Sequence, residues 1–90
     1  VFKRGTMEKQ FREIIQDLGE DCERDGLKNT PKRAAKAFRF LTQGYQEKLE
    51  DVVNNAIFDS NNREMVVVRD IELYSLCEHH LLPFLGTCHI

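Results

Sequence analysis

A short segment, Cys77-Glu78-His79-His80, holds the densest group of side chains suited to chemistry. A cysteine thiolate and a histidine imidazole three residues apart can both reach one zinc ion if the backbone turns after a strand. An isolated Cys-x-x-His pair is usually a chance occurrence, but this segment gathers two of the chain's three histidines. The segment therefore favours a metal site over chance, and Cys77 and His80 have the spacing of two ligands of one zinc ion.

The other residues of this segment allow more than one role. His79 is either a third zinc ligand or an acid–base group, because an imidazole can gain and lose a proton near neutral pH. Glu78 is either a general acid or, as we favour, a carboxylate that faces solvent. Two ligands do not complete a site, since a structural zinc ion takes four and a catalytic one usually three plus water. Cys88 could supply another, although the alternation around it favours a packing role.

A second candidate site lies where a helix is predicted to begin. Asn29-Thr30-Pro31 combines a capping hydroxyl with a proline suited to the first helical position. Arg33 and Lys36 follow on one face of the first turns, where free N–H groups and the helix dipole favour an anion. The pair could clamp a phosphate group. Basic residues on an exposed helix face are common, however, and periodicity alone favours a solvated face.

The elements that must position these residues follow from the spacing of apolar side chains. Residues 7–18 predict an amphipathic helix. A second helix is predicted to begin at residues 30–31, and its apolar stripe recurs as far as Tyr45, with Gly44 as a stop signal. Residues 49–58 carry a weaker helical or mixed pattern, and residues 59–62 predict a turn. This N-terminal part is therefore expected to be helical.

Beyond that turn the pattern is typical of β-structure. Residues 65–68 are apolar and largely β-branched, and residues 71–74 alternate, so we predict one long strand. Residues 82–86 predict a wide connection, and residues 87–90 the start of a returning strand. An unpaired apolar strand is a poor end for a domain. We therefore expect either a longer protein or partner chains that complete the sheet.

Composition restricts the classes of function. Ninety residues, 41% of them hydrophobic and 31% charged, allow one small folded domain below the usual size of a self-sufficient enzyme. Thirteen basic and fifteen acidic residues give a net charge of -2, which argues against a general nucleic-acid binder. No apolar run approaches the roughly 20 residues that span a bilayer. Three cysteines do not form a disulfide framework, so we expect a reducing compartment, most simply the cytoplasm.

Three blocks of sequence together carry a resemblance to a known family. The signature around the zinc site of GTP cyclohydrolase I closely resembles Leu76-Cys77-Glu78-His79-His80-Leu81-Leu82-Pro83-Phe84. An upstream segment of that family is similar to Gly26-Leu27, Thr30-Pro31, Arg33, Ala35-Lys36, Thr42 and Gly44-Tyr45. The strand that leads to its zinc motif resembles Val68-Arg69-Asp70-Ile71. The order and spacing of the blocks agree over nearly everything from Met7 to Ile90.

This resemblance implies an activity and a role for each candidate residue. The family hydrolyses GTP to 7,8-dihydroneopterin triphosphate and formate, the entry step to folate or tetrahydrobiopterin. Cys77 and His80 match two of the family's three zinc ligands. His79 matches the histidine assigned to proton transfer while the five-membered ring of the purine opens. Arg33 and Lys36 match basic residues that hold the substrate triphosphate.

The resemblance also implies a fold and an assembly. We expect an α+β chain that forms the N-terminal half of a subunit: a helical region over residues 1–62, then the first antiparallel hairpin of a tunnelling-fold (T-fold) domain over residues 63–90. The family's third zinc ligand, a cysteine, and its guanine-reading glutamate lie farther downstream. The chain is therefore expected to be part of a longer protein. Family members form rings of ten subunits with shared sites, which implies a homo-oligomer that binds GTP.

Two hypotheses from other classes of protein remain open. A shortened relative could be a non-catalytic interaction or regulatory module that occupies the interface of a full-length subunit through its exposed hairpin edge. Alternatively, a small structural zinc module could be built from Cys77, His80, Cys88 and His89. The zinc module leaves the upstream resemblance unexplained.

Overall fold

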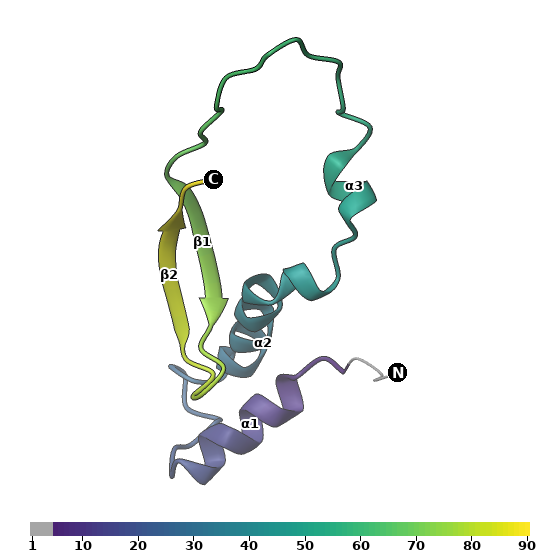
Figure 1. The fold of residues 1–90 in the computed structure, drawn as a ribbon. Coiled ribbons are helices and arrows are strands. Elements are labelled where there is room, and N and C mark those ends of the chain that lie inside the picture. The colour runs from purple at the N-terminus through teal and green to yellow at the C-terminus, as the bar shows by residue number, and fades with distance from the viewer. Residues whose placement is uncertain (1–4) are drawn as a thin grey trace. The chain divides into compact units, whose positions relative to one another are not determined.

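The structure of the protein, a computed structural model, describes residues 5–90. Its elements, in chain order, are α1 (Glu8–Asp17), α2 (Thr30–Leu41), the 3-10 helix η1 (Gln43–Tyr45), α3 (Leu49–Val53), β1 (Ile71–Leu76) and β2 (Pro83–Cys88) (Figure 1). Helices precede a two-stranded antiparallel hairpin, so the predicted α+β class is confirmed. The chain divides into two compact units, one that ends at Phe40 and one that covers Leu41–Ile90. The division between residues 62 and 63 stays a prediction.

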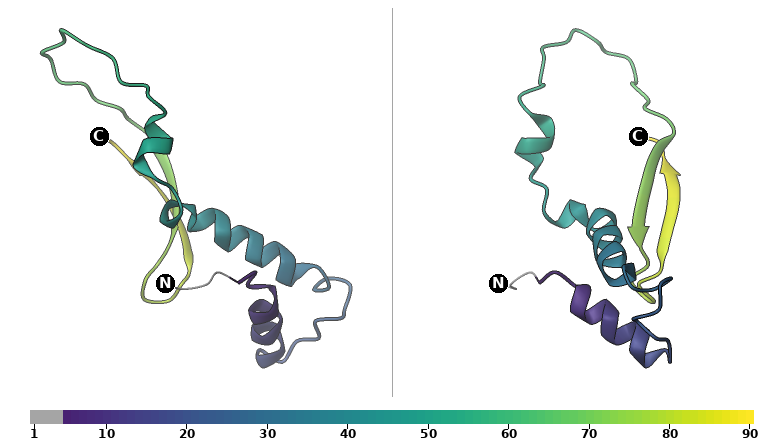
Figure 2. Two further views of the ribbon diagram at one scale, coloured as in Figure 1. Left: turned by 90° about the vertical axis from the view of Figure 1, so that its right-hand side faces the viewer. Right: turned by 180° about the vertical axis from the view of Figure 1, so that it is seen from behind.

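The first unit is built from the apolar stripes of α1 and α2, which Figure 2 shows joined by the segment between them. The rings of Phe11 and Phe38 meet edge to face, with their centroids 4.9 Å apart, an arrangement that aromatic pairs favour. Ile15 and Ala35 are buried. Cys22 is only 3% exposed, and its thiol donates to the carbonyl of Arg12 at 3.3 Å. Cys22 therefore belongs to the packed interior of this unit.

Helix α2 begins where the sequence predicts, but the hydroxyl expected to cap it has another partner. The first helical hydrogen bond runs from the N–H of Arg33 to the carbonyl of Asn29, at 3.1 Å. The hydroxyl of Thr30 donates to the carbonyl of Gly26 in the preceding turn, at 3.4 Å. Thr30 thus stabilises the entry to the helix by donating rather than by accepting a hydrogen bond.

The helical pattern after α2 is shorter than predicted. Helix α2 ends at Leu41, and the tighter η1 replaces its expected extension to residue 45. Helix α3 covers only five of the residues 49–58. Asn54 and Asn55 end it, because both take left-handed conformations, with φ of 49° and 58°.

The prediction of a strand over residues 65–68 is wrong. Within the described part of the chain, no strand lies beside residues 65–67, and Val68 alone of these four exchanges backbone hydrogen bonds with Ile90, at 2.7 and 2.9 Å. The regular ladder begins at Ile71, opposite Cys88. A β-branched run needs a partner strand to become part of a sheet.

A β-bulge separates the Val68 pair from the regular ladder. Arg69 and Asp70 together oppose the single residue His89, which is the two-to-one mismatch of a bulge. Asp70 takes a left-handed conformation, with φ of 59°. Its N–H donates to Nδ1 of His89 at 2.9 Å. The imidazole of His89 therefore satisfies the backbone group that the bulge removes from the ladder.

The hairpin begins its second strand earlier than predicted. Strands β1 and β2 pair antiparallel from Ile71 opposite Cys88 to Leu76 opposite Pro83. The predicted break over residues 82–86 is therefore wrong. Proline is compatible with the first position of a strand, because its missing N–H costs no ladder bond there. Residues 77–82 form the connection, so the Cys-Glu-His-His segment is the hairpin loop.

Candidate functional site

The hairpin loop is closed by two backbone hydrogen bonds that both use Cys77. Its N–H donates to the carbonyl of Leu82 at 2.8 Å, and its carbonyl accepts the N–H of Leu81 at 2.7 Å. The second bond joins residues four apart, the spacing of one α-helical turn. Side chains three apart in such a turn share a face. The backbone therefore brings residues 77 and 80 together.

That face carries the two predicted zinc ligands. Sγ of Cys77 and Nδ1 of His80 lie 3.7 Å apart. A tetrahedral zinc ion, with Zn–S near 2.3 Å and Zn–N near 2.0–2.1 Å, would place two such donors about 3.6 Å apart. Cys77 is half-buried and His80 is exposed, so the pair is accessible from solvent. The donor pair, Cys77 and His80, thus fits a zinc ion, and its role as a metal site stays a prediction.

His79 lies on the same loop, beside the donor pair. Its ring centroid is 6.0 Å from that of His80, and the two ring planes are inclined by 40°. The side chain is exposed. An imidazole in this position can exchange protons with a molecule bound at the donor pair.

Cys88 and His89 do not join the loop donors. Cys88 ends β2, whereas Cys77 follows β1 at the opposite end of the hairpin. Five strand residues at about 3.4 Å each separate the two ends by roughly 17 Å. Residues 5–90 contain no group of three or more Cys, His, Asp and Glu side chains that could hold a metal ion. The hypothesis of a small structural zinc module is therefore wrong.

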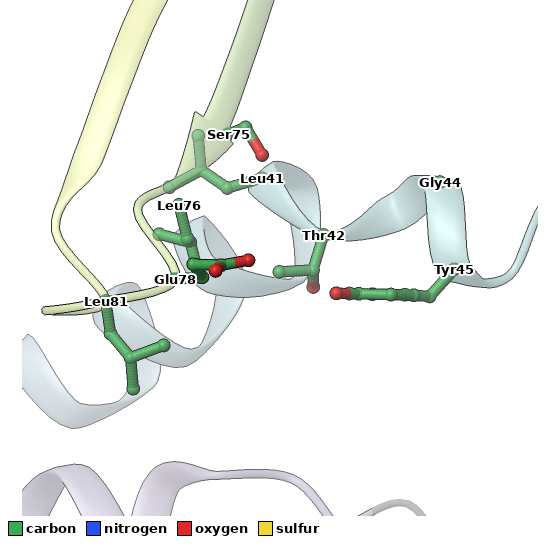
Figure 3. Close-up of a pocket in the computed structure, with 8 residues that line it drawn as sticks. All are labelled: Leu41, Thr42, Gly44, Tyr45, Ser75, Leu76, Glu78 and Leu81. Carbon is green, nitrogen blue, oxygen red and sulfur yellow. The ribbon is translucent and has the colours of Figure 1, made fainter.

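An open pocket of about 600 Å³ lies beside the hairpin loop, within the second unit (Figure 3). It is lined by Leu41, Thr42, Gly44, Tyr45, Ser75, Leu76, Glu78 and Leu81. The carboxylate of Glu78 and the hydroxyl of Tyr45 both point toward Thr42 (Figure 3). Apolar walls and several polar groups thus meet next to the residues of the Cys-Glu-His-His segment.

Arg33 and Lys36 occupy the positions predicted for them, on the first turns of α2 in the first unit. Both side chains are exposed. Within residues 5–90 neither forms an ion pair, whereas Arg39, one turn farther on, donates to the carbonyl of Gly5. Two cations are therefore available for an anion near the positive end of the helix. Their role in binding stays a prediction.

Two exposed pairs away from the loop shift the pKa of one partner. The hydroxyl of Tyr74 donates to Glu72 at 2.8 Å, and this hydrogen bond, together with the negative charge of Glu72, raises the pKa of Tyr74. A hydrogen bond from Arg24 at 2.9 Å, together with its positive charge, lowers the pKa of Glu20. Both shifts are local to their pairs.

Comparison with known proteins identifies the family. The family model described as GTP cyclohydrolase I matches residues 7–90. The chain belongs to the GTP cyclohydrolase I family. The resemblance seen in the sequence is thereby confirmed, and the hairpin loop and the first turns of α2 both lie within the matched range.

Curated members of the GTP cyclohydrolase I family are close in sequence. A GTP cyclohydrolase 1 of Alkalilimnicola ehrlichii is 67% identical over 84 residues, covering 93% of this chain and 45% of that protein. The GTP cyclohydrolase 1 of Methylococcus capsulatus is 61% identical over 85 residues, covering 94% and 46%. That of Chromohalobacter salexigens is 65% identical over 80 residues, covering 89% and 44%. The chain therefore spans a little under half the length of these relatives.

The pocket is the part of the candidate site that sequence reasoning missed. Thr42 and Tyr45 were named from the sequence for their match to the GTP cyclohydrolase I family or for helix periodicity. Ser75 was not named. None of the three was predicted to line a pocket. These residues come together only in space, because η1 and the end of β1 are about thirty residues apart in sequence.

The described helices show no segment long and apolar enough to cross a membrane.

Proposed function

We propose that the full-length protein uses one zinc ion to hydrolyse GTP to 7,8-dihydroneopterin triphosphate and formate. The observation that carries this proposal is the 3.7 Å separation of Cys77 Sγ and His80 Nδ1, on a loop within the family match. The substrate class comes from the relatives, which are named GTP cyclohydrolase 1.

In this proposal the donor pair holds zinc. A catalytic zinc ion takes three protein ligands and keeps one open position. The resemblance supplies a cysteine as the third ligand, from a part of the full-length protein beyond residue 90. When bound, zinc would supply Lewis-acid chemistry, which lowers the pKa of a water at its open position to about 7. Both donors can be reached from solvent, as the entry of water and substrate requires.

His79 is the proposed catalytic residue. Hydrolysis adds water at C8 of guanine, opens the five-membered ring and releases that carbon as formate, so the ring nitrogens must gain protons. His79 is exposed and lies beside the donor pair, with its ring centroid 6.0 Å from that of His80. Imidazole can accept and return protons near neutral pH. His79 therefore moves protons while the ring opens.

Arg33 and Lys36 bind the triphosphate in this proposal. A guanidinium can donate two parallel hydrogen bonds to phosphate oxygens, and an ammonium adds a compact positive charge. Neither side chain forms an ion pair within residues 5–90, so no internal partner must be displaced. The N-terminal end of α2 adds its dipole to the same anion.

The proposal extends to the T-fold, to a ring of ten subunits and to the cytoplasm. The fold and the ring are supported by the exposed apolar surface of the hairpin. Leu85 is 78% exposed, and Tyr74 and Phe84 are about half exposed. Large apolar side chains on a two-stranded sheet are what further strands or subunits would cover.

Replacing Arg33 by alanine should raise the KM for GTP on the order of tenfold with a smaller change in kcat. The reason is the loss of a charge-assisted hydrogen bond to a non-reacting part of the substrate. Steady-state kinetics of the full-length variant measure both constants. Lys32→Ala is the matched control, because Lys32 is also exposed but points about 100° away around the helix. An unchanged KM in Arg33→Ala would argue against the clamp.

The activity itself is tested by incubating the zinc-loaded full-length protein with GTP. We expect equal amounts of formate and 7,8-dihydroneopterin triphosphate, with turnover lost on removal of zinc by a chelator and restored by zinc. A protein that binds a full-length relative but little zinc, and that releases no formate, would support the non-catalytic module instead.

A further inference from the structure

The hairpin loop reaches its donor geometry through an unusual backbone conformation at Leu81. This residue takes a left-handed conformation, with φ of 56°. Glycine and asparagine are the residues that usually take it at the end of a helical turn. A leucine held there must be retained by the structure around it.

The conformation of Leu81 completes the turn that carries the donor pair. The N–H of Leu81 donates to the carbonyl of Cys77 at 2.7 Å, and the next residue, Leu82, accepts the N–H of Cys77 at 2.8 Å. The left-handed residue reverses the chain between these two bonds, so that Leu82 can return to the start of the loop. Without this reversal the bond from the N–H of Cys77 to Leu82 is lost, and the turn that brings Cys77 and His80 together is closed by one hydrogen bond instead of two.

We propose that Leu81 is a positioning residue for the metal site, acting through its backbone rather than its side chain. This inference rests on the proposed function, because it assumes that the donor pair binds zinc. The left-handed conformation keeps Sγ of Cys77 and Nδ1 of His80 3.7 Å apart before the metal arrives. A loop that only rarely holds this arrangement binds zinc more weakly, in proportion to the fraction of time that it is competent.

The side chain of Leu81, rather than its backbone conformation, could hold the donor pair in place. The substitutions must distinguish these two explanations. The side chain lines the pocket beside the loop and is 62% exposed (Figure 3). If its packing mattered, a smaller residue would weaken zinc binding and another branched apolar residue would preserve it. If the backbone conformation matters, a residue that tolerates the left-handed conformation should preserve zinc binding and a β-branched residue should weaken it. Glycine and asparagine tolerate the left-handed conformation, whereas valine is strongly disfavoured there.

The experiment measures zinc affinity of the full-length protein by competition with a chromophoric chelator. Cobalt(II) absorption reports thiolate coordination, and a native mass spectrum checks folding and assembly. Leu81→Val should raise the zinc dissociation constant about tenfold or more, and Leu81→Gly and Leu81→Asn should stay within about threefold of the wild type. Leu82→Val is the matched control, because Leu82 is similarly exposed but has no positive φ. It should also stay within about threefold.

Each outcome either supports or overturns the inference. Equal zinc affinity in Leu81→Val and the wild type overturns it while leaving the proposed function intact. Weakened zinc binding in Leu81→Gly and Leu81→Asn assigns the effect to the side chain of Leu81 and also overturns the inference. This conclusion holds even if Leu81→Val does not fold. A wild-type protein that binds no zinc overturns this inference and the proposed function together.

Discussion

Alanine in place of Cys77 or His80 in the full-length protein is expected to abolish zinc retention and GTP turnover together. Each substitution removes one of three proposed ligands, and the remaining two do not make a catalytic site. Loss of a residue that only supports a ligand typically costs 10–100-fold in metal affinity, so loss of a ligand itself should cost at least about 100-fold. Metal analysis after dialysis, and formate release from GTP, measure the two effects.

The chain provides a matched control for this prediction. Cys88 is a free cysteine of the same hairpin, and like Cys77 it is half-buried. It lies at the opposite end of the ladder, opposite Ile71. Cys88→Ala should therefore retain both zinc and turnover. Loss of zinc in Cys88→Ala, or full zinc occupancy in Cys77→Ala, would contradict the assignment of the donor pair.

The sequence was sufficient to predict those parts of the fold that depend on local patterns. The apolar spacing of residues 7–18 predicted α1 to within about a residue at each end, and the proline after Thr30 marked the start of α2. The proximity of Cys77 and His80 was also predictable, because a turn after a strand brings residues three apart onto one face. Each of these features is decided by neighbours within one or two helical turns.

The features that sequence reasoning missed depend on contacts between distant residues. The strand expected at residues 65–68 has the right residue types, but apart from Val68 its backbone finds no partner in the described part of the chain. The bulge at Asp70 depends on His89, nineteen residues later. The reversal at Leu81 has no sequence signal, since leucine in a left-handed conformation is disfavoured by roughly 1–2 kcal/mol. The hydrogen bonds that hold Leu81 in this conformation form only when the loop is closed onto Cys77.

Alanine in place of His79 is expected to separate zinc binding from catalysis. The variant should retain one zinc ion per subunit and lose about 10²–10⁴-fold in kcat, the range by which a positioned general acid–base group accelerates a reaction. The physical reason is that protons must reach the opening ring while Cys77 and His80 continue to hold the metal. Zinc content and the single-turnover rate of formate release measure the two effects separately.

The control for His79 is the residue that precedes it in the loop. Glu78 is exposed, and the sequence favours a carboxylate that faces solvent over a general acid at this position, so Glu78→Gln should keep both zinc and most of the rate. The outcome also resolves the two roles that the sequence left open for His79. Loss of zinc and rate together in His79→Ala would make this residue a third ligand. Full zinc and full rate would exclude both roles, and proton transfer would have to come from another group of the full-length protein.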